Sequence, residues 1–523
     1  MKAQIEKHQP ANEVAWVGAL VCAASLFGLA LQGMDANWDL RNYHLYNPHA
    51  WLTGRSAVDI APAQLQGFHN PILDLPLYWL QASGAPAVVA GLWLLLPTMV
   101  CLALLLCLQR RLSVEPPGRA AQAVLVLLAI SGAATWSMLG SSMNDPFVAA
   151  AMLGSLALLI RADGDVRPRH WLLAGSLAGA IAGLKLTASL YCIGLAAAAL
   201  VGPWTWRDRA RHVLVLAAGG ACGFALTYGY WGWHLYQQHA NPVFPYFNHV
   251  FHSADAMPWP WTDNRFRAQG VGAAVTSPLQ LLHTTRHFSE IGMRDPRLLG
   301  AIAGLLVLWS LSGGQATTAL RANLLRLLAF VLVSWLLWAF QYGIYRYAMT
   351  LELLGVLAMV LVVQRLRRAR ILGLVALLIV VSADTRRPDW NRKPWSAPVV
   401  PASLAVPENA LLVTASGEPL AYLALALPDH VPVLGLSNNF MSPSHCTRLQ
   451  ARAEERLANH RGPVLLLVGN EQRTAQRVLE LGYGLGAAGA CTRVQGSLEP
   501  AKLCPQRRLA WSQACKLAQP TGG

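Results

Sequence analysis

Apolar runs of roughly twenty residues recur along this chain from Val14 to Ala383, and they constrain the fold more than any other feature. A helix needs about 20 apolar residues to cross the hydrocarbon core of a bilayer, so runs of this length are typical of transmembrane helices. Only 13% of the residues are charged, against about 25% in an average soluble chain. Most of the chain is therefore predicted to lie in a membrane, and only the part after Ala383 is predicted to be water-soluble.

Many of the arginines behind the formal net charge of +15 lie in short clusters between the apolar runs. Such clusters are typical of the cytoplasmic loops of membrane proteins, so the charge indicates orientation and we expect no nucleic-acid partner. About eleven spans put every cluster on the inner side. The N-terminus, which carries Lys2 and Lys7, then lies in the cytoplasm. Two long loops, residues 34–84 and 237–295, and the C-terminal tail then lie outside.

The predicted fold is an all-α polytopic membrane domain over residues 1–383, a linker over 384–407 and a small extracytoplasmic α/β domain over 408–523. In the tail, short apolar runs alternate with helix-like segments, which is typical of such domains. Four cysteines in one small domain indicate two disulfides and an oxidising compartment, with three alternative pairings. The candidates are Cys446, Cys491, Cys504 and Cys515.

Two ionisable residues, Lys185 and Glu352, lie within apolar stretches. Charges inside a membrane are costly and are functional candidates with a partner. Glu352 follows Arg346 by six positions, about 240° around a helix, so the two do not share a face. Lys185 is then the candidate partner of Glu352, and a purely structural ion pair is the favoured interpretation. In the alternative, Lys185 joins Arg346 in binding an anion. The run 171–203 is too long for one crossing and predicts two helices, with Lys185 near the turn between them.

The first outer loop is dense in side chains that bind sugars or transfer protons. A carboxylate just outside a span can act as a general base. From the residues alone, a solvated loop aspartate is the favoured interpretation, and four positions are equivalent: Asp35, Asp39, Asp59 and Asp74.

The order of motifs resembles the GT-C superfamily of polytopic membrane glycosyltransferases, and a bacterial subgroup of it. Trp38-Asp39-Leu40 and Tyr43 follow the first span, as in the first loop of that superfamily. The later motifs are Phe68-His-Asn-Pro, Ser142-Met-Asn-Asp-Pro146, Gly183-Leu-Lys-Leu-Thr187, Asn241-Pro-Val-Phe-Pro245 and Tyr345-Arg-Tyr347 followed by Glu352. The resemblance covers nearly the whole chain, and it depends on the order and sidedness of the motifs.

The resemblance implies inverting transfer of a sugar from a polyprenyl-phosphate carrier to a lipid, glycan or protein acceptor, outside the bacterial inner membrane. Asp39 matches the catalytic base of the superfamily, and Asp35 is the reserve candidate. Arg346, with Lys185, is assigned to the donor phosphate, because the arginine fork suits phosphate oxygens. Substrate binding is assigned to Tyr43, His44, Asn70, Asp145 and Tyr345, and supporting roles to Asp35 and Glu352.

Some members of the superfamily hold a divalent metal near the loop that contains Asp145. The paired acidic motif of those members is missing, so we expect no metal, although Mg²⁺ or Mn²⁺ would suit oxygen ligands. Asp145 is instead expected to cap the helix that begins at Pro146.

Two alternatives are a transporter or flippase of a lipid-linked or polar solute, and a membrane anchor for the tail. A transporter predicts inverted repeats and broken spans, and the sequence contains no convincing repeat. An anchor leaves the polar density of the first loop unexplained.

Overall fold

The computed structural model describes residues 11–162, 164, 166–312, 317–366, 368–396, 399–400 and 403–509. Contacts divide the chain into two compact units. The helical unit comprises Met1–Gly33, Gly91–Gly229 and Asp263–Asp389, as far as these ranges are described. The sheet unit comprises Met34–Ala90, Tyr230–Thr262 and the described part of Trp390–Gly523.

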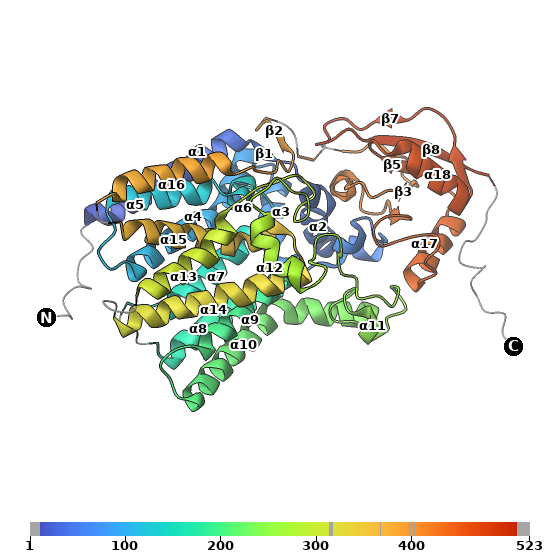
Figure 1. Cartoon of the computed structure of the whole chain (residues 1–523). Helices are drawn as coiled ribbons and strands as arrows, with labels where there is room; N and C mark the ends of the chain where they lie inside the picture. The colour runs from blue at the N-terminus through green and yellow to red at the C-terminus, as the bar shows by residue number, and fades with distance from the viewer. Residues whose placement is uncertain are drawn as a thin grey trace. The chain divides into compact units, whose positions relative to one another are not determined.

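Each predicted span coincides with a helix in the described structure (Figure 1). These helices are α1 (Ala11–Gln32), α4 (Ala87–Leu112), α5 (Arg119–Ile130), α7 (Asp145–Leu159), α8 (Pro168–Leu184), α9 (Ser189–Leu200), α10 (Trp206–His239), α13 (Arg297–Leu311), α14 (Thr318–Gln341), α15 (Met349–Gln364) and α16 (Arg370–Asp384). Two shorter helices, α6 (Ala133–Ser137) and α12 (Val271–Gln280), lie between them in the chain.

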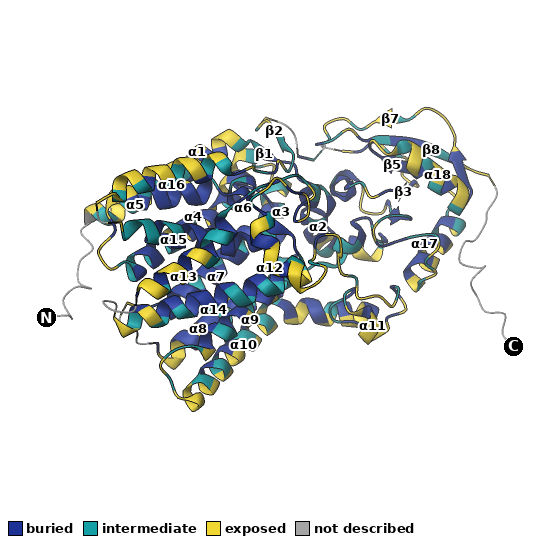
Figure 2. Cartoon of the chain, viewed as in Figure 1, coloured by how far each residue is buried: buried dark blue, intermediate teal, exposed yellow. Residues whose placement is uncertain are grey.

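Among the described residues, five helices are long and apolar enough to cross a membrane: α1, α4, α10, α14, and α15 with the turn before it. The other helices at predicted spans are 12 to 17 residues long. Within the helical unit α15 packs against α13 and α7, and it is buried on nearly all sides (Figure 2). In contrast, α1 exposes large apolar side chains such as Phe27, as a lipid-facing helix would.

Glycines let α8 and α10 pack backbone to backbone. Gly175, Gly179 and Gly183 recur every four residues along one face of α8. A Cβ atom added to Gly179 would lie 2.0 Å from the Gly220 carbonyl oxygen, and one added to Gly175 would lie 2.0 Å from the Leu216 carbonyl oxygen. Small residues at such spacing allow close approach of membrane helices, which attract one another by packing rather than by the hydrophobic effect.

The sheet unit contains a six-stranded mixed sheet, which confirms the predicted α/β fold of the tail. The strand order is β4-β3-β5-β8-β6, with β7 paired to β8. The strands are β3 (Leu411–Thr414), β4 (Val433–Gly435), β5 (Val464–Val468), β6 (Leu485–Ala487), β7 (Thr492–Arg493) and β8 (Lys502–Arg508), and the helices of the tail are α17 (Arg448–Asn459) and α18 (Gln472–Tyr483). The strands β3, β4 and β5 are parallel to one another, and β8 runs antiparallel to β5.

The first outer loop packs on this sheet. It contains α2 (Tyr46–Thr53) and α3 (Leu75–Ala82), and β1 (Met34–Asp35) pairs with β2 (Arg392–Lys393) of the segment before the sheet. Arg55 and Asp59 form a fully buried ion pair. Arg55 also donates to the Val431 carbonyl, and Asp59 accepts from the Val433 amide. The sequence division assigned this loop to the membrane domain, whereas the contacts group it with the tail because it supplies hydrogen bonds to the edge of β4.

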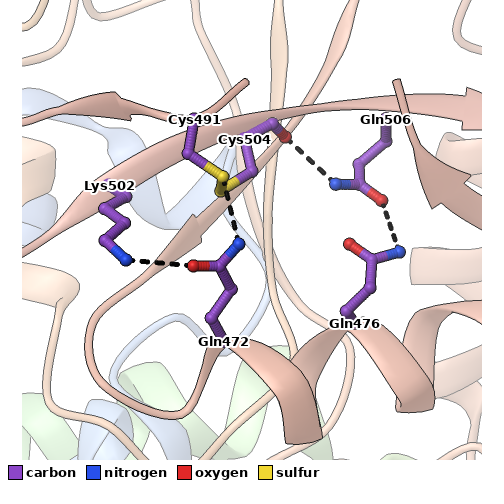
Figure 3. Close-up of a disulfide and its surroundings, with 6 residues drawn as sticks. All are labelled: Gln472, Gln476, Cys491, Lys502, Cys504 and Gln506. Atoms are coloured by element: carbon purple, nitrogen blue, oxygen red, sulfur yellow. Dashed lines mark hydrogen bonds between the residues drawn. A yellow bond between two sulfur atoms is a disulfide. The ribbon is translucent and has the colours of Figure 1, made fainter. Parts of the chain in front are cut away.

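A disulfide joins Cys491 to Cys504 on β8 (Figure 3). The Gln472 side chain at the start of α18 donates to the Cys491 sulfur and accepts from Lys502, so the bond lies in a polar setting. The prediction of a disulfide in the tail is thus confirmed for this pair. Cys446 lies at the surface, and Cys515 lies outside the described residues.

Candidate functional site

Lys185 lies at the break between α8 and α9, as the length of that apolar run predicts. It is the residue after α8 and has extended backbone angles, and a single 3-10 turn, Leu186–Ala188, follows before α9. The break ends α8 with a cationic side chain next to its unpaired carbonyl groups, which is electrostatically favourable. The Lys185 ammonium group is consequently fixed at the end of a packed helix rather than at a flexible loop tip.

The Lys185 ammonium group lies 2.6 Å from Asp145 Oδ1, and Arg346 Nη1 lies 3.5 Å from Asp145 Oδ2. The carboxylate is 4% exposed, and the two cationic side chains are 15% and 14% exposed. The prediction that Asp145 caps α7 is wrong, because Asn144 precedes the helix at the cap position and the Asp145 carboxylate is engaged by the two cations. The two cationic side chains thus converge on one buried carboxylate.

The Tyr347 ring completes this cluster. The Lys185 nitrogen lies 5.3 Å from the ring centroid, and the Arg346 guanidinium carbon lies 5.0 Å from it. Cations within about 6 Å of an aromatic ring are attracted by its quadrupole. The Tyr191 hydroxyl donates to the Tyr347 carbonyl at 2.5 Å, which holds the short turn Tyr345–Ala348 in place. We call Asp145, Lys185, Arg346 and Tyr347 the Asp145 cluster, and all four residues belong to the helical unit.

Tyr345, assigned to substrate binding from the sequence, lies elsewhere in the helical unit. It is 2% exposed, and its ring packs edge-on against Trp338. Because Tyr345 and Tyr347 are neighbours in one turn, sequence reasoning could not decide which ring meets the cations.

Glu352 does not pair with Lys185, so that prediction is wrong. The Glu352 carboxylate accepts hydrogen bonds from the Ala134 and Thr135 amides and from the Thr135 hydroxyl, at 2.7 to 2.9 Å. These amides belong to the first turn of α6, whose N–H groups have no partner within the helix. Gly132 makes room for the carboxylate, since a Cβ atom there would lie 2.1 Å from Glu352 Oε1.

A second buried ion pair lies next to Glu352, and the sequence interpretation missed it. Asp295 Oδ2 accepts from Arg297 Nη1 at 2.9 Å and from the Ala133 amide at 2.7 Å. Both side chains are fully buried, and Arg297 also donates to Ser131 and to the Leu128 carbonyl. The signal was an arginine inside the predicted span 296–311, which needs a partner as much as Lys185 does. Because both terminal nitrogens of the Arg297 guanidinium and both Asp295 oxygens are bound to protein, this network has the character of a structural support.

In the sheet unit, the residues of the first outer loop fall into two groups. Asp39 precedes the five-residue helix Leu40–His44, is 7% exposed, and makes no capping bond with its side chain. The Asp35 carboxylate accepts from the Asn37 amide group at 2.9 Å, which braces the turn before Asp39.

The second group links the substrate-binding candidates of this loop. His44 Nδ1 lies 2.8 Å from Asp74 Oδ1 in a buried contact, and the Tyr43 ring packs on His44 and His69. The side-chain oxygen of Asn70 accepts from the Ile72 amide and so shapes the following turn. Of the four aspartates that the sequence left equivalent, Asp59 and Asp74 are therefore engaged with Arg55 and His44.

In the described part of the chain, no three histidine, cysteine or acidic side chains gather as they would around a metal ion.

No protein-family description matches the chain, and no curated protein matches it. Among solved structures, the chain is similar to ArnT from Cupriavidus metallidurans in the apo state, with 12% identity over 98% of this chain and 99% of that chain, at a TM-score of 0.42. It is also similar to ArnT bound to undecaprenyl phosphate, with 13% identity over 94% and 98% of the two chains and a TM-score of 0.41. A third is the mycobacterial arabinofuranosyltransferase AftD, with 13% identity over 95% of this chain and 40% of that one, at a TM-score of 0.44. At these identities the likeness concerns the fold alone, and it assigns no substrate and no site residue to this chain.

Proposed function

We propose that this chain is an inverting membrane glycosyltransferase of the GT-C type, which transfers a sugar from a polyprenyl-phosphate carrier at the outer face of a bacterial inner membrane. The N-terminus would be cytoplasmic, and the sheet unit would lie outside. The observation that carries the proposal is the convergence of Lys185 and Arg346 on the single carboxylate of Asp145. Two cationic side chains at low exposure are a favourable place for a phosphate group.

The chemistry needs an anion site more than an acid. The acceptor hydroxyl attacks the anomeric carbon, its proton passes to the Asp39 carboxylate, and the bond between that carbon and the phosphate oxygen breaks. The electron pair of the broken bond remains on the polyprenyl phosphate. Because this leaving group is an anionic phosphate, cationic side chains stabilise the charge that develops on it. Arg346 supplies a planar fork for phosphate oxygens, and Lys185 a compact point charge.

Binding of undecaprenyl phosphate tests the anion site. We expect Arg346→Gln and Lys185→Gln each to weaken binding by about 10- to 100-fold, because a hydrogen bond to a charged group contributes about 1.5–3 kcal/mol. Arg294→Gln is the matched control, since Arg294 also pairs with an aspartate, Asp384, at 3.1 Å but lies outside the cluster. Thermophoresis of the purified protein in detergent measures the affinities. If both cluster variants bind like the wild type, the donor site is elsewhere.

Turnover tests the base. Asp39→Asn should keep undecaprenyl phosphate binding and lose transfer from polyprenyl-phosphate sugars, by about 100-fold or more as expected for a general base. Asp35→Asn is the comparison, because Asp35 is the reserve candidate from the sequence. Full activity of a folded Asp39→Asn variant would remove Asp39 from the mechanism.

A further inference from the structure

A cavity of about 360 Å³ is lined wholly by residues of the sheet unit. Its walls come from α2, the turn Gln64–Phe68, the C-terminal end of α10 and α17. Its volume falls at the lower end of the range for small-molecule sites, about 300–1,000 Å³. The lining mixes aromatic rings with a few polar side chains, which is typical of sites for polar ligands that also have apolar faces.

Two tryptophans give the cavity a rigid aromatic wall. The Trp51 and Trp231 rings meet edge to face, with centroids 6.1 Å apart. Trp231 is 6% exposed, and its indole nitrogen donates to the Phe68 carbonyl at 3.0 Å, so the ring is held in one orientation. His234, one turn further along α10, stacks on Trp231 at 5.1 Å. An aromatic wall of this kind can pack against the C–H face of a sugar ring by dispersion forces.

Asn47 supplies a hydrogen-bond acceptor that the protein does not use. Its side-chain nitrogen donates to the Gln66 and His69 carbonyls, which fixes the orientation of the amide. Its side-chain oxygen is buried without a hydrogen-bond partner among the described residues, and Asn47 as a whole is 3% exposed. A buried acceptor left without a donor is costly, and a ligand hydroxyl would relieve that cost. Since Asn47 lines the cavity, a ligand there is well placed to do so.

His239 supplies a second polar group. Its Nδ1 atom lies 2.8 Å from Asp255 Oδ2, so Nδ1 donates to that carboxylate and Nε2 remains as the other ring nitrogen that can form a hydrogen bond. Arg448 holds the same carboxylate with bonds of 2.6 and 2.7 Å. Burial alone would raise the pKa of Asp255, but the bonds from Arg448 and His239 outweigh it and lower that pKa to about 2. Asp255 therefore stays ionised and holds the His239 ring in one orientation.

We propose that this cavity binds a sugar ring of the acceptor glycan, with one face of the ring on Trp231 and hydroxyl groups hydrogen-bonded to Asn47 and His239. Two fixed polar groups beside an aromatic wall match a ligand that has both C–H faces and hydroxyl groups, since a hydroxyl group can donate or accept. A lipid chain would leave the Asn47 oxygen unsatisfied. The identification of this sugar as part of the acceptor rests on the proposed function. The binding of a sugar is inferred from the cavity alone.

Saturation-transfer NMR on the full purified chain tests this directly. The probes are methyl glycosides of glucose, mannose, galactose and arabinofuranose, and we expect transfer to at least one of them. Trp51→Leu and Gln238→Ala, two partly or fully exposed lining positions, should weaken that signal about three- to tenfold. Trp233→Leu and Gln237→Ala are the matched controls on α10, because neither residue lines the cavity, and they should leave the signal unchanged.

The outcomes separate the two proposals. Arg346→Gln should weaken undecaprenyl phosphate binding by about 10- to 100-fold and leave the glycoside signal intact. If that variant still binds undecaprenyl phosphate normally, the proposed function fails while the cavity result stands. No transfer to any glycoside, equal transfer in Trp51→Leu and wild type, or displacement of the glycoside by undecaprenol would overturn the sugar site.

Discussion

Replacement of Asp145 by asparagine separates two roles that this carboxylate could have in an anion site. In the protein without ligand, Asp145 is the common partner of the two cations that meet it at 2.6 and 3.5 Å. If the cluster binds a lipid phosphate, the same carboxylate repels that phosphate. Asp145→Asn keeps the shape of the side chain and removes only the charge, so affinity and stability should move in opposite directions.

The affinity gain follows from the removed repulsion. Two unit charges about 5 Å apart interact by about 3 kcal/mol at an effective dielectric constant of about 20. The cationic side chains are 15% and 14% exposed, so solvent screens part of this interaction. We therefore expect undecaprenyl phosphate to bind Asp145→Asn about 10- to 100-fold more tightly than the wild type. Without ligand the variant should unfold more easily, by about 1–3 kcal/mol, because two neighbouring cations lose their common partner.

Thermal unfolding in detergent, with and without undecaprenyl phosphate, measures both effects at once. The variant should have a lower Tm than the wild type without ligand and a larger rise in Tm with it, since stabilisation grows with ligand concentration relative to Kd. Undecaprenol, which lacks the phosphate, should change the Tm of the wild type and of the variant by the same amount. Asp263→Asn is the matched control, because Asp263 pairs with Arg265 at 2.7 Å on the surface, where ion pairs contribute little.

Weaker binding by Asp145→Asn, with the control unchanged, would refute this reasoning. It would mean that the carboxylate holds Lys185 and Arg346 in place for the ligand rather than competing with it. Unchanged binding would mean that the phosphate does not enter the cluster at all.

Three further predictions concern the fold. Gly179→Ala should lower the Tm by forcing α8 away from α10, at a cost of about 1–3 kcal/mol, whereas Gly229→Ala on α10, where nothing lies within 4 Å, should be neutral. Burial, and secondarily the Arg55 charge, lowers the pKa of His49 from 6.5 to about 4. Unfolded His49 takes up a proton between those values and folded His49 does not, so stability should fall as the pH drops from 6.5 to 4, and His49→Gln should flatten that part of a plot of Tm against pH. With Cys491 bonded to Cys504, peptide mapping without reduction should find the second predicted disulfide between Cys446 and Cys515, and a free thiol at Cys446 would contradict it.

The sequence by itself predicted the elements that depend on local physics. The length of an apolar run decides whether a helix can cross a bilayer, and each predicted span coincides with a helix. The same holds for the tail, where β3, β4 and β5 coincide with short apolar runs and α17 and α18 with the helix-like segments between and after them. The break at Lys185 followed from length as well, because one apolar run exceeded a single crossing.

Only the tertiary structure decided which charges meet. Asp145 and Lys185 are 40 residues apart, and their contact depends on how α7 and α8 are rotated and shifted against each other. A rotation of one residue, about 100° on a helix, would point either side chain elsewhere, and no local pattern fixes that angle. For the same reason the partner predicted for Glu352 was wrong, the pair of Asp295 and Arg297 was missed, and no pattern distinguished Tyr347 from Tyr345. The first outer loop belongs to the sheet unit because Arg55 and Asp59 form hydrogen bonds with the edge of β4. These bonds join residues more than 370 positions apart, so no local pattern indicates them.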